Sequence, residues 1–286
     1  MSKRLRAGKH WRRLRFGLST LLNIKKLGFF IPYRYAADLV EPKTYGALEP
    51  LFAQGEVQFE RFLTAAEAHI DHLVDFSRAP EPHPRLNQDW FPGLDAIAAY
   101  TIVRKLKPAR IVEVGSGHST RFLSLAVQDE NISTQIDTID PVPRADIAAL
   151  PSVRLHQHLV QDTPDTLWEG LGPNDIVSLD GSHILAPGTD VDMFLTTILP
   201  KIAGNPVLHI HDMTLPDAYP ADWAWRGYNE QGAMAGLIAS GAYEVLWSSH
   251  YVATRMESRL ERSPLRELPR NKHAIETSLW LTPSRN

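Results

Sequence analysis

Four side chains that can bind protons or cations follow two short apolar runs in the second half of the chain. Asp180 and His183 lie in the sequence Ser-Leu-Asp-Gly-Ser-His, and His211 and Asp212 lie in His-Ile-His-Asp. A cluster of carboxylates and imidazoles can bind a divalent ion or perform acid–base chemistry, and histidine suits proton abstraction at neutral pH. We therefore expect Asp180, His183 and Asp212 to converge on one catalytic site, with His211 beside them.

These residues also have structural interpretations that the sequence leaves open. Asp180 can cap the turn at Gly181, His183 can be bonded to the backbone, and His211 can be a core residue. Strand alternation places His209 and His211 on one face of the sheet. Burial of both would then require a polar partner for each imidazole.

A glycine turn forms the second candidate site. The β-branched run 110–114 leads into the turn Gly115-Ser116-Gly117, and a helical segment follows from His118. Glycine allows a sharp turn and a close approach of a ligand. The start of a helix offers unpaired N–H groups and a positive dipole end. The arrangement is typical of a site for a nucleotide-like ligand.

The residues around the turn favour S-adenosylmethionine over a dinucleotide. Thr120 stands where the dinucleotide motif requires a third glycine. Glu113 would repel a pyrophosphate but attract a sulfonium and an ammonium group. Asp140 closes the next predicted strand, from which an acid commonly binds ribose hydroxyls, and Asp137 is the competing candidate. The expected cofactor contacts are Glu113, Gly115, Ser116, Gly117, Ser119, Thr120 and Asp140.

Strands and helices alternate around these residues. The predicted strands are 110–114, 135–139, 153–156, 175–179, 206–211, 243–248 and 278–281, and the predicted helices are 94–106, a segment from 118, 144–150, 190–199 and 229–240. The alternation indicates an α/β fold, a Rossmann-like and mostly parallel seven-stranded sheet with helices on both faces. Ligands bind such sheets at the carboxyl ends of the strands, where both candidate sites fall.

The N-terminal region differs from the rest in charge. Residues 1–34 contain ten Lys or Arg and no acid, whereas the remainder contains 20 basic and 33 acidic residues. Apolar residues recur among these charges at helical spacing: Trp11, Leu14, Leu18, Leu21 and Leu22. We expect a basic amphipathic helix able to lie on anionic lipid through residues 1–31. Packing on its own domain and a disordered tail are the alternatives.

The same region contains neither a membrane span nor a signal peptide by its sequence. The apolar stretch 27–31 is too short to cross a bilayer, and Lys25 and Lys26 interrupt any signal-peptide core. Three regions are predicted: a basic arm over 1–34, a helical layer with a proline-rich loop over 35–89, and a cofactor-binding domain over 90–286.

The composition is that of a soluble globular protein. Of the 286 residues 43% are hydrophobic, 22% are charged and none is cysteine. Disulfides, thiolate metal sites and cysteine nucleophiles are therefore excluded. The lack of cysteine fits a reducing compartment, and we expect a cytoplasmic protein with peripheral membrane contact.

The glycine turn, Asp140 and the two His/Asp blocks follow the order of class I S-adenosylmethionine-dependent methyltransferases, which the chain resembles over residues 90–286. It resembles more narrowly a bacterial subfamily with Asp-Gly-Ser-His, His-Ile-His-Asp and a proline-rich, Trp-containing loop, here 215–223. The Asp180 block is also similar to that of macrolide sugar O-methyltransferases. This likeness implies that Asp180 is a metal ligand and His183 the base. It places the other ligands on His211 and Asp212, where histidine replaces an acid.

The resemblance implies O-methylation of a sugar or other small hydroxyl-bearing acceptor. The expected partner is a small molecule or a glycan, and no nucleic acid. Asp180 and Asp212 would hold Mg or Mn or orient the acceptor, and the histidine at 211 leaves a metal-free site open. An acceptor wall is expected from Trp223, Trp225, Tyr228 and Glu230. An NAD(P)-dependent oxidoreductase and a catalytically silent, membrane-apposed interaction protein are the alternative functions.

Overall fold

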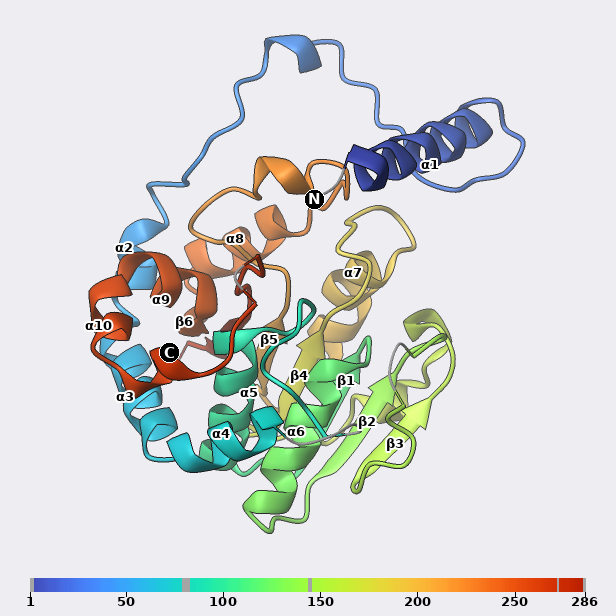
Figure 1. The fold of residues 1–286 in the computed structure, drawn as a ribbon. Coiled ribbons are helices and arrows are strands. Elements are labelled where there is room, and N and C mark those ends of the chain that lie inside the picture. The colour runs from blue at the N-terminus through green and yellow to red at the C-terminus, as the bar shows by residue number, and fades with distance from the viewer. Residues whose placement is uncertain (1–2, 79–82, 144–145, 272, 285–286) are drawn as a thin grey trace.

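A seven-stranded, mostly parallel sheet forms the centre of the computed structural model, which describes residues 3–78, 83–143, 146–271 and 273–284 (Figure 1). The strands are β1 (Arg110–Val114), β2 (Gln135–Ile139), β3 (Val153–His156), β4 (Ile176–Leu179), β5 (Val207–Ile210), β6 (Tyr243–Ser248) and β7 (Leu279–Pro283). Their order is β3-β2-β1-β4-β5-β7-β6, with β1 to β5 parallel and β7 antiparallel to β5 and β6. This confirms the predicted Rossmann-like fold.

Helices lie on either side of the sheet (Figure 1). They are α1 (Lys3–Leu21), α2 (Glu49–Ala53), α3 (Glu56–Glu67), α4 (Ile70–Arg78), α5 (Gly93–Leu106), α6 (His118–Asp129), α7 (Asp190–Met193), α8 (Gln231–Ala239), α9 (Ser249–Arg255) and α10 (Glu257–Glu261). The apolar helix α5 packs against α6 and ends at Lys107, whose φ of +50° turns the chain towards Pro108.

The predicted helical layer shares the core of the sheet domain. Helix α3 packs on α5 and β6, where Phe59 and Phe62 meet Trp247 edge to face. Arg259 of α10 forms ion pairs of 2.7 Å with Glu60 and Glu67 of α3. One continuous hydrophobic core therefore joins the layer to the sheet. The proposed boundaries at 34 and 89 stay predictions.

Two predicted helices differ from the structure, and part of a predicted loop lies outside the described residues. The predicted helix 144–150 is wrong over its described part, 146–150, which forms turns. Pro151 disfavours helical backbone at Leu150, the residue before it, which works against a helix over this short segment. The predicted helix 190–199 consists of α7, a π-helical turn (Phe194–Ile198) and the start of a 3-10 turn. Of the proline-rich loop, residues 79–82 lie outside the described residues.

Helix α1 stands apart from the globular body, on the side where the loops after β4 and β5 lie (Figure 1). It is linked to α2 by a largely extended segment with one short 3-10 turn, Ala36–Asp38. None of the helices in the described residues is long and apolar enough to cross a membrane.

Candidate active site

The glycine turn after β1 lies directly against the end of β4. Gly115 has a φ of +81°, and a Cβ at this position would collide with the carbonyl oxygen of Asp180. At Gly117 φ is +157°, and a Cβ would meet no atom within 4 Å. Glycine is required at both positions by the backbone, and at Gly115 also by the close contact. The start of α6 thus faces open space beside Asp180, where an anion-rich turn can receive a cationic ligand.

Glu113, Ser119 and Thr120 hold this turn from the inside. Glu113 is fully buried, and its two carboxylate oxygens accept hydrogen bonds of 2.6 Å from the hydroxyls of Ser119 and Thr120. The Thr120 hydroxyl also accepts the N–H of Gly117 at 3.0 Å. Burial raises the pKa of Glu113 to about 7. These polar groups face one another and fix the first turn of α6, and their direct contact with a cofactor stays a prediction.

Asp140, and not Asp137, is the acid beside the turn. The Asp140 carboxylate accepts the N–H and the hydroxyl of Ser116 at 2.9 Å each, and the N–H of Val142 at 2.8 Å. Asp137 is buried lower in β2 and pairs with His156 at 2.8 Å. The half-exposed Asp140 is therefore the second-strand acid that a ligand at the turn can reach.

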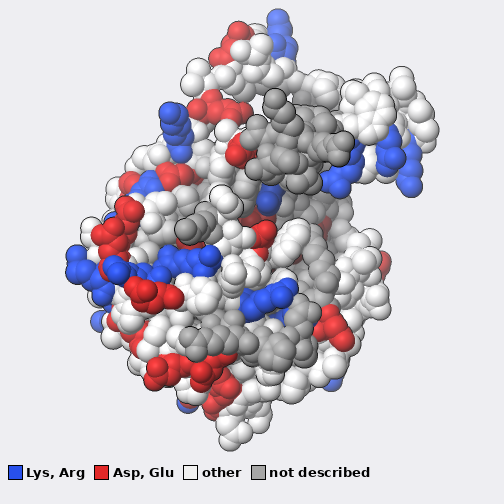
Figure 2. Space-filling view, viewed as in Figure 1, with Lys and Arg blue, Asp and Glu red and all other residues white. Residues whose placement is uncertain are grey.

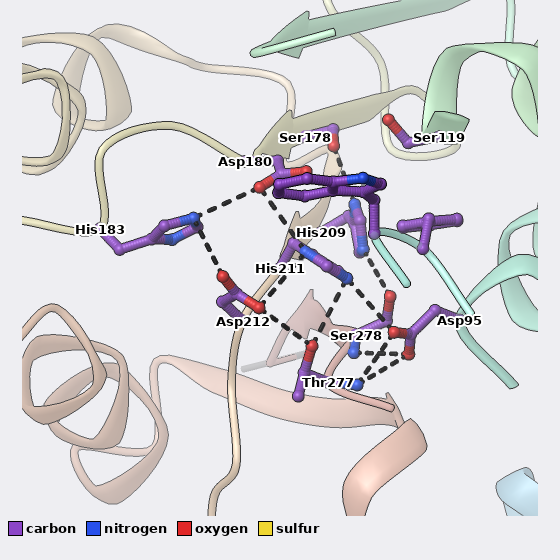
Figure 3. Close-up of polar contacts among 12 residues, drawn as sticks. Asp95, Ser119, Ser178, Asp180, His183, His209, His211, Asp212, Thr277 and Ser278 are labelled. Carbon is purple, nitrogen blue, oxygen red and sulfur yellow. Dashed lines mark hydrogen bonds and ion pairs between the residues drawn. The ribbon is translucent and has the colours of Figure 1, made fainter. Parts of the chain in front are cut away.

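In the second cluster the His183 imidazole points towards Asp180 and Asp212 (Figure 3). Its Nε2 lies 3.3 Å from Asp180 Oδ1 and 3.4 Å from Asp212 Oδ2, and its Nδ1 lies 2.5 Å from Glu230 Oε1. Both His183 and Asp212 have positive φ, +59° and +56°, a conformation that is unfavourable for these residues and is concentrated at functional sites. The strand ends therefore bring together Asp180, His183 and Asp212, as the sequence predicts.

His211 lies behind this group and is held from a distant helix. Its Nε2 is 3.2 Å from Asp95 Oδ2, and its Nδ1 is 3.6 Å from Asp180 and 3.8 Å from Asp212. Asp95, at the start of α5, also accepts the backbone N–H groups of Thr277 and Ser278 at 2.8–3.0 Å. His211 thus joins the site to α5 and to the chain before β7.

His209 is on the same face as His211, and its role is structural. Its Nδ1 is 2.8 Å from the Ser178 hydroxyl and its Nε2 is 3.0 Å from the Ser278 hydroxyl. The imidazole stacks on Trp280 with ring centroids 4.3 Å apart. Burial, with the nearby His211, lowers the pKa of His209 to about 3, so it is neutral. Both buried histidines have the polar partners that burial requires.

The other two imidazoles are positively charged. Burial by itself would lower the pKa of His183, but Glu230, Asp180 and Asp212 outweigh it and raise the pKa to about 10. Burial would also lower the pKa of His211. Asp180 and Asp95 outweigh this effect and raise the pKa of His211 well above its ordinary value. Burial by itself would raise the pKa of Asp180, but the imidazoles of His211 and His183 hold it well below its usual range. The site is therefore a network of ion pairs at neutral pH.

The donor atoms of this network do not fit a metal ion. Within the described residues, no group of three or more His, Asp or Glu side chains could hold one. The predicted ligands Asp180, His211 and Asp212 do lie together, but the His211 nitrogens face carboxylates, and Arg226 donates a hydrogen bond of 3.1 Å to Asp212. The structure therefore does not support the expectation of Mg or Mn, and we derive no step through a metal.

A family model described as a methyltransferase domain matches residues 112–213, from β1 to just after β5. The match spans the glycine turn, Asp140 and both His/Asp blocks, on the predicted Rossmann-like sheet. Residues 112–213 therefore form a methyltransferase domain, as the resemblance predicts. S-adenosylmethionine is the cofactor that such a domain leads us to expect. The match favours the methyltransferase over the alternative of an NAD(P)-dependent oxidoreductase.

Comparisons with other proteins give only distant similarity to this methyltransferase. An SAH-bound methyltransferase from Podospora anserina is 14% identical, with 91% of this chain and 100% of that chain covered and a TM-score of 0.42. An O-methyltransferase from Bacillus cereus in complex with SAH is 11% identical, with 88% and 96% covered and a TM-score of 0.40. No curated protein matches.

The loop after β5 covers the methyltransferase site. The Tyr228 ring packs on the His183 imidazole, with centroids 4.4 Å apart. Arg226, bonded to Asp212, lies over the Trp223 ring at 4.0 Å. Glu230, in contrast, is fully buried and bonded to His183, so its predicted place in an acceptor wall is wrong.

Sequence reasoning missed Asp95, Arg226 and Thr277. The Thr277 hydroxyl lies 3.4 Å from His211 Nε2 and from Asp212 Oδ1. The one signal for Asp95 is an acid in the first turn of an otherwise apolar helix, and Arg226 lies among the aromatic residues of a loop that the sequence already marked.

Proposed function

We propose that the protein transfers the methyl group to a hydroxyl oxygen of a small acceptor such as a sugar, without a metal ion, and that His183 receives the acceptor's proton. One observation carries this proposal. His183 lies between Asp180 and Asp212, next to the glycine turn, and Glu230 holds its far nitrogen. A carboxylate behind an imidazole fixes its orientation and stabilises its protonated form.

When bound, S-adenosylmethionine supplies an electrophilic methyl group on a positively charged sulfonium. On transfer, the S–CH3 bond would break to leave a neutral thioether as the O–CH3 bond forms, and the acceptor's proton would move to Nε2 of a neutral His183. The positive charge that leaves the sulfonium thus reappears on the imidazolium. Three carboxylates surround that imidazolium and raise its pKa to about 10. They stabilise the protonated product of the step, and they also make the neutral base the minor form of His183 at neutral pH.

The residues around His183 support this assignment. Asp180, with a side-chain exposure of 30%, is the most accessible acid of the site and can accept a hydrogen bond from the acceptor. Trp223 and Tyr228 give the apolar surfaces and Arg226 the polar group that suit a sugar ring. We propose that Asp140 binds the ribose hydroxyls of the cofactor. The turn formed by Gly115, Ser116 and Gly117 would then approach the cofactor closely.

Methyl transfer from radiolabelled S-adenosylmethionine to panels of sugars, phenols and amines tests the proposal. We expect label on hydroxyl acceptors, and a loss of turnover of about 10²–10⁴ in His183→Ala with cofactor affinity retained in calorimetry. His72→Ala, at an exposed histidine of α4, is the matched control. Transfer to amines alone, or full turnover in His183→Ala, would refute it.

A further inference from the structure

Residues 11–40 of the N-terminal arm expose an apolar face that none of the other described residues covers. Along α1 and the turn after it, Trp11, Leu14, Leu18, Leu22 and Ile24 line a shallow groove of about 260 Å³. Trp11 is 68% exposed and Ile24 is 75% exposed. Soluble proteins seldom expose a continuous apolar surface of this kind without a binding function.

Basic side chains surround this face. Arg12, Arg13, Arg15, Lys25 and Lys26 are all exposed, and residues 1–34 contain no acid. Figure 2 shows blue and white but no red on the described part of this projecting helix. The surface that covers the apolar face must therefore be both apolar and negatively charged.

We propose that the arm docks on an anionic phospholipid bilayer, with its apolar face among the acyl chains and its Lys and Arg side chains at the headgroups. A nucleic acid would satisfy the charges but leave Trp11, Leu14 and Leu18 in water. A second copy of the arm would bring equal charges together. The bilayer alone satisfies both features of the arm.

Co-sedimentation with vesicles tests this proposal on the full chain. Vesicles of phosphatidylcholine with phosphatidylserine should bind the protein at low salt, with at least about tenfold weaker binding at high salt. Arg12→Glu with Arg13→Glu, and separately Leu14→Glu with Leu18→Glu, should each weaken binding at least about tenfold. Far-ultraviolet circular dichroism should show a gain of helix on binding, since an isolated helix of this length is marginal in water.

Val57→Glu, a 67% exposed apolar position on α3, is the matched control and should bind as the original protein does. An unchanged melting temperature in each variant verifies that the globular body is intact. The proposal is wrong if the vesicles do not bind the protein or bind Leu14→Glu with Leu18→Glu equally well. It is also wrong if RNA competes the protein off the vesicles, or if the arm instead drives formation of a dimer.

Discussion

Replacing Glu230 by Gln removes the charge behind His183 while keeping the shape of the side chain. Glu230 is fully buried, and its Oε1 lies 2.5 Å from His183 Nδ1. The carboxylate accepts the Nδ1 proton and leaves Nε2 free for the acceptor. A Gln amide can donate to Nδ1 instead, which moves the imidazole proton to Nε2 and blocks it as a base. We expect turnover to fall by about 10²–10⁴.

Glu230→Gln should also shift the pH dependence of kcat/KM. The carboxylates raise the pKa of His183 to about 10, so kcat/KM of the original enzyme should rise with pH up to about pH 10, as the free imidazole becomes neutral. Without the Glu230 charge the pKa falls, and the rising limb should move to lower pH. A purely structural role would lower activity equally at every pH.

The stability of the fold should fall with rising pH, whereas kcat/KM should rise. The pKa of His183 in the folded protein lies above its ordinary value of 6.5. The stabilisation of the fold by the charged His183 is therefore complete below about pH 6.5 and is lost as pH rises through 10. In Glu230→Gln this loss should be smaller. At neutral pH the substitution should lower the free energy of unfolding by about 1–3 kcal/mol, since the Gln side chain can keep one hydrogen bond to His183.

Rate profiles and histidine NMR titrations of ¹⁵N-labelled protein measure both effects, with the His183 signal identified by its absence in His183→Ala. Glu244→Gln, at an exposed position of β6, is the control and should match the original protein. If Glu230→Gln retains full turnover and the His183 titration does not move, Glu230 neither orients nor charges this imidazole.

Three further predictions concern the rest of the site. Gly115→Ala should abolish cofactor binding in calorimetry, because a Cβ collides with Asp180; unchanged affinity would place the cofactor elsewhere. Asp95→Asn should lower stability by about 3–5 kcal/mol in denaturant unfolding, because it leaves His211 without its buried counter-charge; the exposed Asp162→Asn should change it by less than about 0.5 kcal/mol. Extensive chelation should leave activity unchanged, and rescue of a chelated, inactive enzyme by one divalent ion would contradict the metal-free site.

The sequence by itself determined where the strands lie along the chain and which residues follow them. Runs of apolar residues and glycine or proline breaks are local signals, and they place Gly115, Asp180 and Asp212 after the first, fourth and fifth strands. Because the carboxyl ends of parallel strands meet at one edge, the convergence of these residues follows from topology alone.

Tertiary structure decided the partners of those residues. Asp95 reaches His211 from α5, Thr277 reaches it from the chain before β7, and Glu230 turns inwards to His183. No local pattern encodes contacts between residues so far apart in sequence, since they depend on how whole elements pack. The charge states of the three buried histidines follow from those contacts, which make His209 neutral and the other two cationic.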